Sequence, residues 1–161
     1  MTEFSANTNH AVFLAGEEAR GLGGDAVAPE HLLLALTLFP SNASMALAGW
    51  GADAATVTRA IRFASLPKPS PGTAPFTPAG QEALEAAREV AARLRKHSVE
   101  PEHLLLGLTL VNDEGFTDVL RRTGVTAEQL QRSIAAVIPL SPAKLQEALG
   151  AGRQGPAAGS E

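Results

Sequence analysis

The sequence contains no cysteine, which excludes a disulfide framework and any metal site built on thiolates. Aromatic residues make up only 4% of the chain, so a buried core must be aliphatic. The net charge is −4, whereas a general nucleic-acid-binding protein needs a basic face. No apolar stretch approaches the roughly 18 residues of a membrane span. The start, MTEFSANTNH, also lacks the basic and apolar regions of a signal peptide. These absences predict a soluble cytoplasmic protein with neither nucleic acid nor membrane as a partner.

Motifs of catalysis are missing as well. The chain has no Gly-x-Ser-x-Gly elbow, no cysteine nucleophile and no Gly-x-x-x-x-Gly-Lys-[Ser/Thr] phosphate loop. The histidines that follow Glu30 and Glu102 are not spaced as zinc ligands, because no second histidine lies one helical turn away. The sequence therefore predicts a protein that is not an enzyme and that carries no metal ion or cofactor.

The chain repeats itself. The segment PEHLLLALTL at 29–38 returns as PEHLLLGLTL at 101–110, and only Ala35 and Gly107 differ between the two. Other residues recur 72 or 73 positions apart: Phe4 and Phe76, Ala15 and Ala87, Leu47 and Leu120, Gly51 and Gly124. Such self-similarity identifies an internal tandem repeat.

Within each repeat, apolar residues recur at spacings of three and four, which is typical of helices that face a core. No segment alternates with period two for long enough to predict a sheet. The expected helices lie at 5–22, 29–39, 42–50 and 53–65 in the first repeat, and at 78–96, 101–111, 114–122 and 127–138 in the second. The predicted fold class is all-α, with four helices in each repeat packed about a pseudo-twofold axis.

Segments rich in proline and glycine divide the chain into four parts. Repeat 1 is expected at 1–65 and repeat 2 at 76–138, joined by a linker at 66–75 that is rich in proline. Residues 139–161 should hold a short helix near 142–149 and a disordered tail rich in glycine, alanine and proline.

Two glutamates are the main candidates for a binding role. Glu30 and Glu102 each occupy the second position of a short helix, directly after a proline. A favourable interaction with the helix dipole, about 0.3–1 kcal/mol, would by itself explain both. The alternative is a symmetric pair of anionic sites at two exposed helix starts, where free backbone N–H groups lie beside each carboxylate.

Three other side chains have structural explanations with a functional alternative. His31 and His103 are expected to bond to neighbouring backbone at the helix start, with metal binding as the alternative. Trp50 is expected to pack on a corner between helices, with stacking on a ligand as the alternative.

The doubled Glu-His-Leu-Leu-Leu core, with its flanking segments from FSANTNHAVFLAGEEARGLGGDAVAPEHLLLALTL to FTPAGQEALEAAREVAARLRKHSVEPEHLLLGLTL, resembles the N-terminal domain of the Clp family of AAA+ unfoldases. The resemblance covers residues 4–138 and implies a compact eight-helix domain. In those unfoldases the domain precedes two ATPase modules, docks adaptors and captures substrates for a protease. The expected partners are thus a Clp unfoldase, an adaptor or substrate proteins. Since the chain stops soon after the second repeat, we expect a stand-alone recognition module without a motor.

In the ClpC-like branch this domain reads phosphorylated arginine, and the glutamate of each motif meets the guanidinium. The matching residues are Glu30 and Glu102. Two departures from that branch weaken the likeness. In the first, proline stands before each glutamate, where that branch usually has threonine. The arginine of its Phe-Thr-x-Arg start is also replaced, by Asn7 and Ala79. Phosphoarginine is one candidate ligand.

Some actinobacterial members of the family bind cyclic-peptide antibiotics near the start of the second repeat. Phe76, Thr77 and Pro78 match that start, Glu85 and Arg88 lie further along the same helix, and Phe4 is the counterpart of Phe76. The implied alternative function is that of a decoy, which sequesters such a peptide away from the unfoldase.

Overall fold

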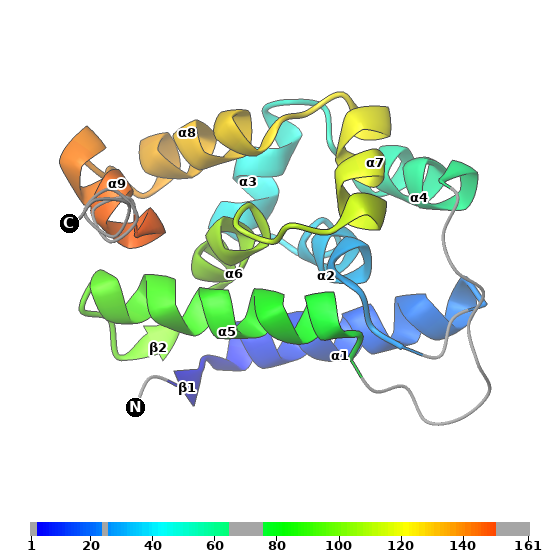
Figure 1. Cartoon of the computed structure of the whole chain (residues 1–161), viewed down its shortest axis with the longest axis horizontal. Coiled ribbons are helices and arrows are strands. Elements are labelled where there is room, and N and C mark those ends of the chain that lie inside the picture. Colours follow the sequence, from blue (N-terminus) through cyan, green and yellow to red (C-terminus); the bar gives the residue numbers. More distant parts are fainter. Residues whose placement is uncertain (1–2, 24–25, 65–75, 151–161) are drawn as a thin grey trace, which may run out of the picture.

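The computed structural model describes residues 3–23, 26–64 and 76–150, and in these ranges the chain is mostly helical (Figure 1). The first repeat forms α1 (Ala6–Gly21), α2 (Pro29–Leu36), α3 (Asn42–Ala48) and α4 (Ala54–Phe63). The second forms α5 (Pro78–Arg93), α6 (Pro101–Leu108), α7 (Glu114–Thr123) and α8 (Ala127–Val137), followed by α9 (Pro142–Leu149). The all-α prediction is confirmed, and each helix lies within a few residues of its expected place. The linker expected at 66–75 and the tail from 151 lie outside the described residues.

Local sequence explains where the helices begin. Most starts have a Ser, Thr or Asp whose side chain accepts a hydrogen bond from the backbone N–H three residues on, as N-caps do. These caps are Ser5, Ser41, Asp53, Thr77, Asp113, Thr126 and Ser141. The second helix of each repeat instead starts at a proline, whose missing N–H would have no helical partner.

The repeated ten residues form the centre of the molecule. In α2 and α6 the leucines are at most 1% exposed: Leu32, Leu33, Leu34, Leu36, Leu104, Leu105, Leu106 and Leu108. Helices α1 and α5 cover one side of this pair, whereas α3, α4, α7 and α8 cover the other (Figure 1). The prediction that each copy seats a buried central helix is confirmed.

The prediction that the chain has no sheet is wrong in one detail. Strand β1 (Glu3–Phe4) pairs in parallel with β2 (Ser98–Val99), and Val27 forms a single bridge with Phe76. A strand of two residues is too short to leave a period-two pattern. The two pairings correspond, because the segment before the first helix of each repeat pairs with the segment before the second helix of the other. The repeats are therefore joined reciprocally.

Other contacts between the repeats involve whole helices. Helix α3 packs on α8, α4 on α7, and α2 on both α5 and α6. Trp50 lies at this junction, 43% exposed, and its indole N–H donates to the hydroxyl of Ser133 on α8. The expected position of Trp50 on a corner between helices is confirmed.

Candidate functional site

An open cleft of about 1150 Å³ lies where the start of α2 meets two helices of the other repeat, α5 and α7. The cleft contains the first of the two candidate glutamates, Glu30. Its lining is Ala28, Glu30, Thr77, Pro78, Ala79, Asn112, Asp113, Glu114, Gly115, Thr117, Asp118, Arg121 and Arg122. We call it the Glu30 cleft.

The carboxylate of Glu30 lines this cleft from a buried position. Its residue is only 5% exposed, and its Oε1 atom has no hydrogen-bond partner among the described residues. Burial raises the pKa of Glu30 to about 7; the hydrogen bond from its own backbone N–H opposes this rise, and the nearby charge of Asp113 adds to it. A buried oxygen without a partner is costly, so a donor that reached it after a turn of the Glu30 side chain towards the cleft would be bound favourably.

The helix-start position predicts an exposed carboxylate in both repeats, and for Glu30 this is wrong. Helices α5 and α7 pack against α2, so the start of α2 is covered by the other repeat. Glu102, the second-repeat counterpart, keeps an intermediate exposure.

The backbone N–H groups that were expected to be free beside the glutamates are largely used. The N–H of Ala28 donates to Nδ1 of His31 (3.0 Å), and the N–H of Glu100 donates to Nδ1 of His103 (2.9 Å). The next residue in each helix is a proline without an N–H, and the N–H of each histidine bonds back to the carbonyl of the cap residue. Both histidines therefore bond to neighbouring backbone, as predicted, and neither helix start offers a row of free donors.

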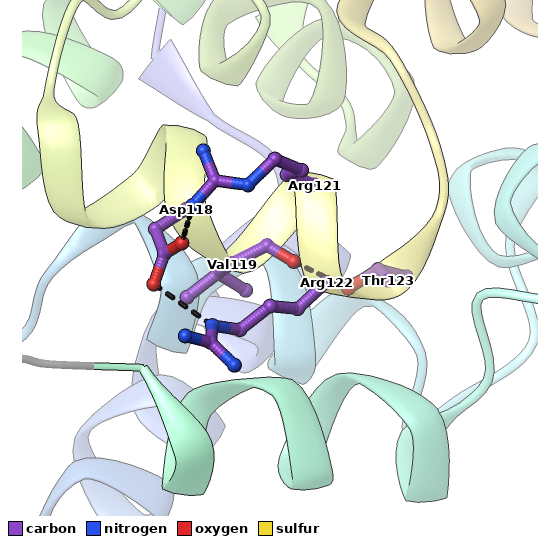
Figure 2. A network of polar contacts seen from close by, with 5 residues as sticks. All are labelled: Asp118, Val119, Arg121, Arg122 and Thr123. Carbon is purple, nitrogen blue, oxygen red and sulfur yellow. Dashed lines mark hydrogen bonds and ion pairs between the residues drawn. The ribbon is translucent and has the colours of Figure 1, made fainter.

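Acidic groups outnumber basic groups in the Glu30 cleft. Its four carboxylates and two guanidinium groups give a net charge of −2 when all are ionised. Both guanidinium groups are already paired: Asp118 bonds to Arg121 and, at 2.9 Å, to Nε of Arg122 (Figure 2). The hydrogen bond from Arg122 is the main cause that lowers the pKa of Asp118. The cleft is therefore an environment that favours a cation.

Asp113 is held in place by the fold of α7. It is the N-cap of that helix, and its carboxylate accepts a hydrogen bond from the N–H of Phe116 at 2.9 Å. Its negative charge is thus fixed at the rim of the cleft, beside Glu114 in the first turn.

Glu102 lines a second cleft of about 480 Å³, in the corresponding place of the other repeat. Its other lining residues are Asn7, Pro40, Ser41, Asn42, Ser44, Met45, Glu100 and Pro101. Most of these side chains are neutral, and none of them is basic. The two clefts are related by the repeat and have the same net charge of −2 when all groups are ionised, but they differ in size and in the number of charged side chains.

A small apolar pocket of about 310 Å³ adjoins the Glu30 cleft, between the end of α6, α7 and the start of α8. It is lined by Leu108, Thr109, Val111, Phe116, Thr117, Leu120, Arg121, Val125, Thr126 and Ala127. Thr117 and Arg121, one turn apart on α7, belong to both linings. We call it the α7 pocket.

Sequence reasoning missed the contribution of α7 to both of these sites. A signal was present in the difference between the repeats, since α3 reads NASMALA whereas α7 reads EGFTDVLRRT. The charged residues of the second copy have no counterparts in the first. A position at which one copy of a repeat becomes charged is a sign of a role beyond packing.

The six residues predicted for a cyclic-peptide surface fall into two groups. The guanidinium of Arg88 lies 4.6 Å from the ring centre of Phe4 and 3.3 Å from the carboxylate of Glu85. Thr77 and Pro78, in contrast, line the Glu30 cleft. Phe76, directly before them, pairs with Val27. Seven helical residues separate Pro78 from Glu85, which corresponds to about 10 Å along α5.

The described part of the chain holds no group of three or more His, Cys, Asp or Glu residues arranged to bind a metal ion. Within the same ranges, none of the helices combines the length and apolar character that crossing a membrane requires.

Comparison with known proteins identifies relatives of this fold and sequence. Residues 75–154 match the family described as the Clp repeat (R) N-terminal domain. The chain is 32% identical over 136 residues to the chaperone protein ClpD2 of Oryza sativa chloroplasts, a match that covers 80% of this chain but 14% of ClpD2. It is 28% identical to an uncharacterized protein of Mycobacterium tuberculosis, with 84% of this chain and 53% of that protein covered. The chain thus spans only a small part of the chaperone and about half of the mycobacterial protein.

A solved structure shows the same fold. The N-terminal domain of the chaperone ClpD from Arabidopsis thaliana superimposes with a TM-score of 0.70 at 22% identity. The match covers 86% of this chain and 96% of that domain.

Proposed function

Because the chain belongs to the Clp repeat N-terminal domain family, we propose that it is a protein- and peptide-binding module that recognises substrates, degradation tags or adaptors for a Clp chaperone–protease system. Its partners in this proposal are a Clp unfoldase, an adaptor or a substrate protein in the bacterial cytoplasm. Its action is binding alone, without catalysis, cofactor or metal.

One observation carries the proposal. Glu30 lines an open cleft, is nearly fully buried, and has a buried carboxylate oxygen without a partner among the described residues. A planar guanidinium fork matches a carboxylate better than any other side chain does. An arginine of a bound protein is therefore the group that this position suits best.

Phosphoarginine is the tag that the two glutamates suggest. Its guanidinium would face Glu30 or Glu102, as in the ClpC-like branch. In the second cleft the hydroxyl of Ser41 could donate to the phosphate while it accepts the N–H of Ser44, whereas the hydroxyl of Ser44 already donates to the carbonyl of Ser41.

A calorimetric titration with free phosphoarginine tests this tag, on the wild type and on the variants Glu30→Gln, Glu102→Gln and both together. We expect two sites in the wild type, of which the one at Glu30 is the weaker, one site in each single variant and none in the double variant. A titration without heat in the wild type would exclude phosphoarginine and leave the wider binding function to be tested with adaptors and unfolded substrates.

The second candidate function is sequestration of cyclic-peptide antibiotics that target the unfoldase. The contact of Arg88 with Phe4 and Glu85 favours it, because this cluster presents an aromatic ring, a cation and a carboxylate together on a partly exposed face. Removal of the guanidinium in Arg88→Ala should weaken binding of such a peptide, measured by fluorescence anisotropy. Unchanged affinity in Arg88→Ala and in Phe4→Ala would exclude this surface.

A further inference from the structure

Resting on the proposed binding function, we propose that the Glu30 cleft and the α7 pocket form one bipartite site for an extended peptide segment. The segment carries an unmodified arginine or lysine, which enters the cleft, and a bulky aliphatic residue about three positions away, which enters the pocket.

The cation is inferred from the carboxylates that surround the cleft. Glu30 has an oxygen without a partner, and Asp113 and Glu114 lie at the rim. Among the described residues no lysine lines the cleft, and the two arginines in its lining are both bound to Asp118. An entering guanidinium or ammonium group would pair with the Glu30 carboxylate once the side chain turns its buried Oε1 towards the cleft.

The same observations disfavour a phosphate in this cleft. A phosphorylated arginine would add negative charge to a site in which carboxyl groups outnumber guanidinium groups by four to two. The charged donors of the cleft are already engaged, since both guanidinium groups bond to Asp118, and at the start of α2 the N–H groups of Ala28 and His31 bond within the helix start. The unmodified side chain is therefore the better ligand.

The apolar anchor is inferred from the pocket next to the cleft. Its volume of about 310 Å³ is enough for one large side chain, and apart from Arg121 and three threonines its lining is aliphatic or aromatic. Thr117 and Arg121 form a ridge along α7 with the cleft on one side and the pocket on the other. Side chains on neighbouring faces of one helix lie on the order of 10 Å apart, which an extended peptide spans with about three residues.

The second repeat supplies a matched control. Glu102 occupies the same helical position, but its cleft is smaller and is lined largely by neutral side chains. The bipartite segment should thus depend on Glu30 and not on Glu102.

Fluorescence anisotropy with the full chain tests the proposal. The probe is a labelled decapeptide of Gly and Ser with one Arg and, three positions later, one Leu; a second probe has the reverse order. Three further peptides each carry one change. In the first the Arg is replaced by citrulline, its neutral isostere, in the second by phosphoarginine, and in the third the Leu is replaced by Ala. The protein variants are Glu30→Gln, Ala127→Trp and the control Glu102→Gln. The tryptophan of Ala127→Trp fills the α7 pocket from its rim. The helical content of each variant is checked by circular dichroism.

We expect one of the two orders to bind. Affinity should fall about tenfold or more with citrulline and with Glu30→Gln, which lose a charged hydrogen bond, and by a similar factor with the Leu-to-Ala peptide and Ala127→Trp. Glu102→Gln should leave the affinity unchanged.

Three results would overturn the proposal. They are equal binding of the citrulline peptide, tighter binding of the phosphoarginine peptide through Glu30, and no binding of either order. The second would support a tag reader at both clefts. If no unmodified peptide bound but free phosphoarginine still gave heat, the bipartite site would fall and the tag-reading function would stand.

Discussion

The Glu30 side chain is kept in an environment that opposes its own ionisation. Its pKa is raised to about 7, mainly by burial, and the structure retains it although a neutral side chain would fit with less cost. Glu30 destabilises the folded protein near neutral pH and lines a cleft. Both facts fit a role in binding better than a role in stabilising the helix through its dipole. The helix-start interaction favours the ionised form, and here burial outweighs it.

Replacing Glu30 by Gln should stabilise the protein at high pH. Because the folded-state pKa lies above the ordinary value of 4.5, the folded state binds this proton more tightly than the unfolded state does. Protonation of Glu30 therefore stabilises the folded state; this stabilisation is complete below pH 4.5 and is lost as the pH rises through 7. A shift of this size corresponds to about 3 kcal/mol. We expect Glu30→Gln to exceed the wild type by up to about this amount in urea unfolding at pH 8, and the gap to close towards pH 5.

The control for this experiment is Glu102→Gln, which removes a carboxylate at the same helical position of the second repeat. A gap between Glu30→Gln and the wild type that stayed constant from pH 5 to pH 8 would contradict the raised pKa of Glu30.

His31 and His103 should titrate in the opposite direction. Burial lowers the pKa of each to about 4, so both stay neutral, and since Nδ1 accepts a hydrogen bond the proton must be on Nε2. Their folded-state pKa is below the ordinary 6.5, so their contribution to the stability of the folded protein is present above pH 6.5 and is lost as the pH falls towards 4. Nitrogen-15 NMR of the imidazoles at pH 5.5 should show two neutral rings protonated at Nε2. Two protonated rings at that pH would contradict their burial.

At the scale of the helices, one substitution inside the repeated motif reflects a difference in packing. A Cβ atom on Gly107 would lie 2.7 Å from the backbone nitrogen of Ala87 and 3.0 Å from the carbonyl oxygen of Ala83. Helix α6 therefore approaches α5 so closely that only glycine fits. Ala35, its counterpart in α2, is fully buried and has room for its methyl group.

Gly107→Ala should accordingly destabilise the protein although alanine favours helices. The methyl group would meet backbone atoms that cannot move aside, and overpacking of this kind costs about 1–3 kcal/mol. The matched change Ala35→Gly should cost about 1 kcal/mol through backbone entropy and lost packing. Urea unfolding of the two variants measures both values. A Gly107→Ala protein as stable as the wild type would show that α5 and α6 are further apart.

The helices themselves could be predicted from the sequence because their signals are local. Capping side chains such as Asp53 and Thr126 and the proline at the start of α2 each mark a boundary within a few residues. The strands could not be predicted, because Phe4 finds its partner Val99 only after the two repeats have packed. The burial of Glu30 was missed for the same reason, since the covering helices come from the other repeat.

At the scale of the whole molecule, the repeat in the sequence predicts two similar units but not how they combine. The binding features lie between the units, because the Glu30 cleft needs α2 from one repeat and α7 from the other. Clefts at such junctions depend on side chains that are distant in the sequence, and a comparison of the two copies is the only sequence signal for them.

The two repeats should therefore unfold as one unit. Each lends its first residues to the other, at β1 with β2 and at Val27 with Phe76, and α3 and α4 pack on α8 and α7. Ile134 on α8 is fully buried, and Ile134→Ala should cost about 2–5 kcal/mol. We expect this loss to appear equally in the hydrogen exchange of the most protected amides of α1 and of α5, because neither repeat retains its core without the other.

The reverse variant, Leu47→Ala on α3 of the first repeat, should lower the protection of α5 in the same way, since Leu47 is 1% exposed and its helix packs on α8. If Ile134→Ala left the protection of α1 unchanged, the repeats would be independent units and the Glu30 cleft would open whenever they separated. If both variants act across the junction, the cleft is as stable as the core, and a peptide meets a site that is already formed.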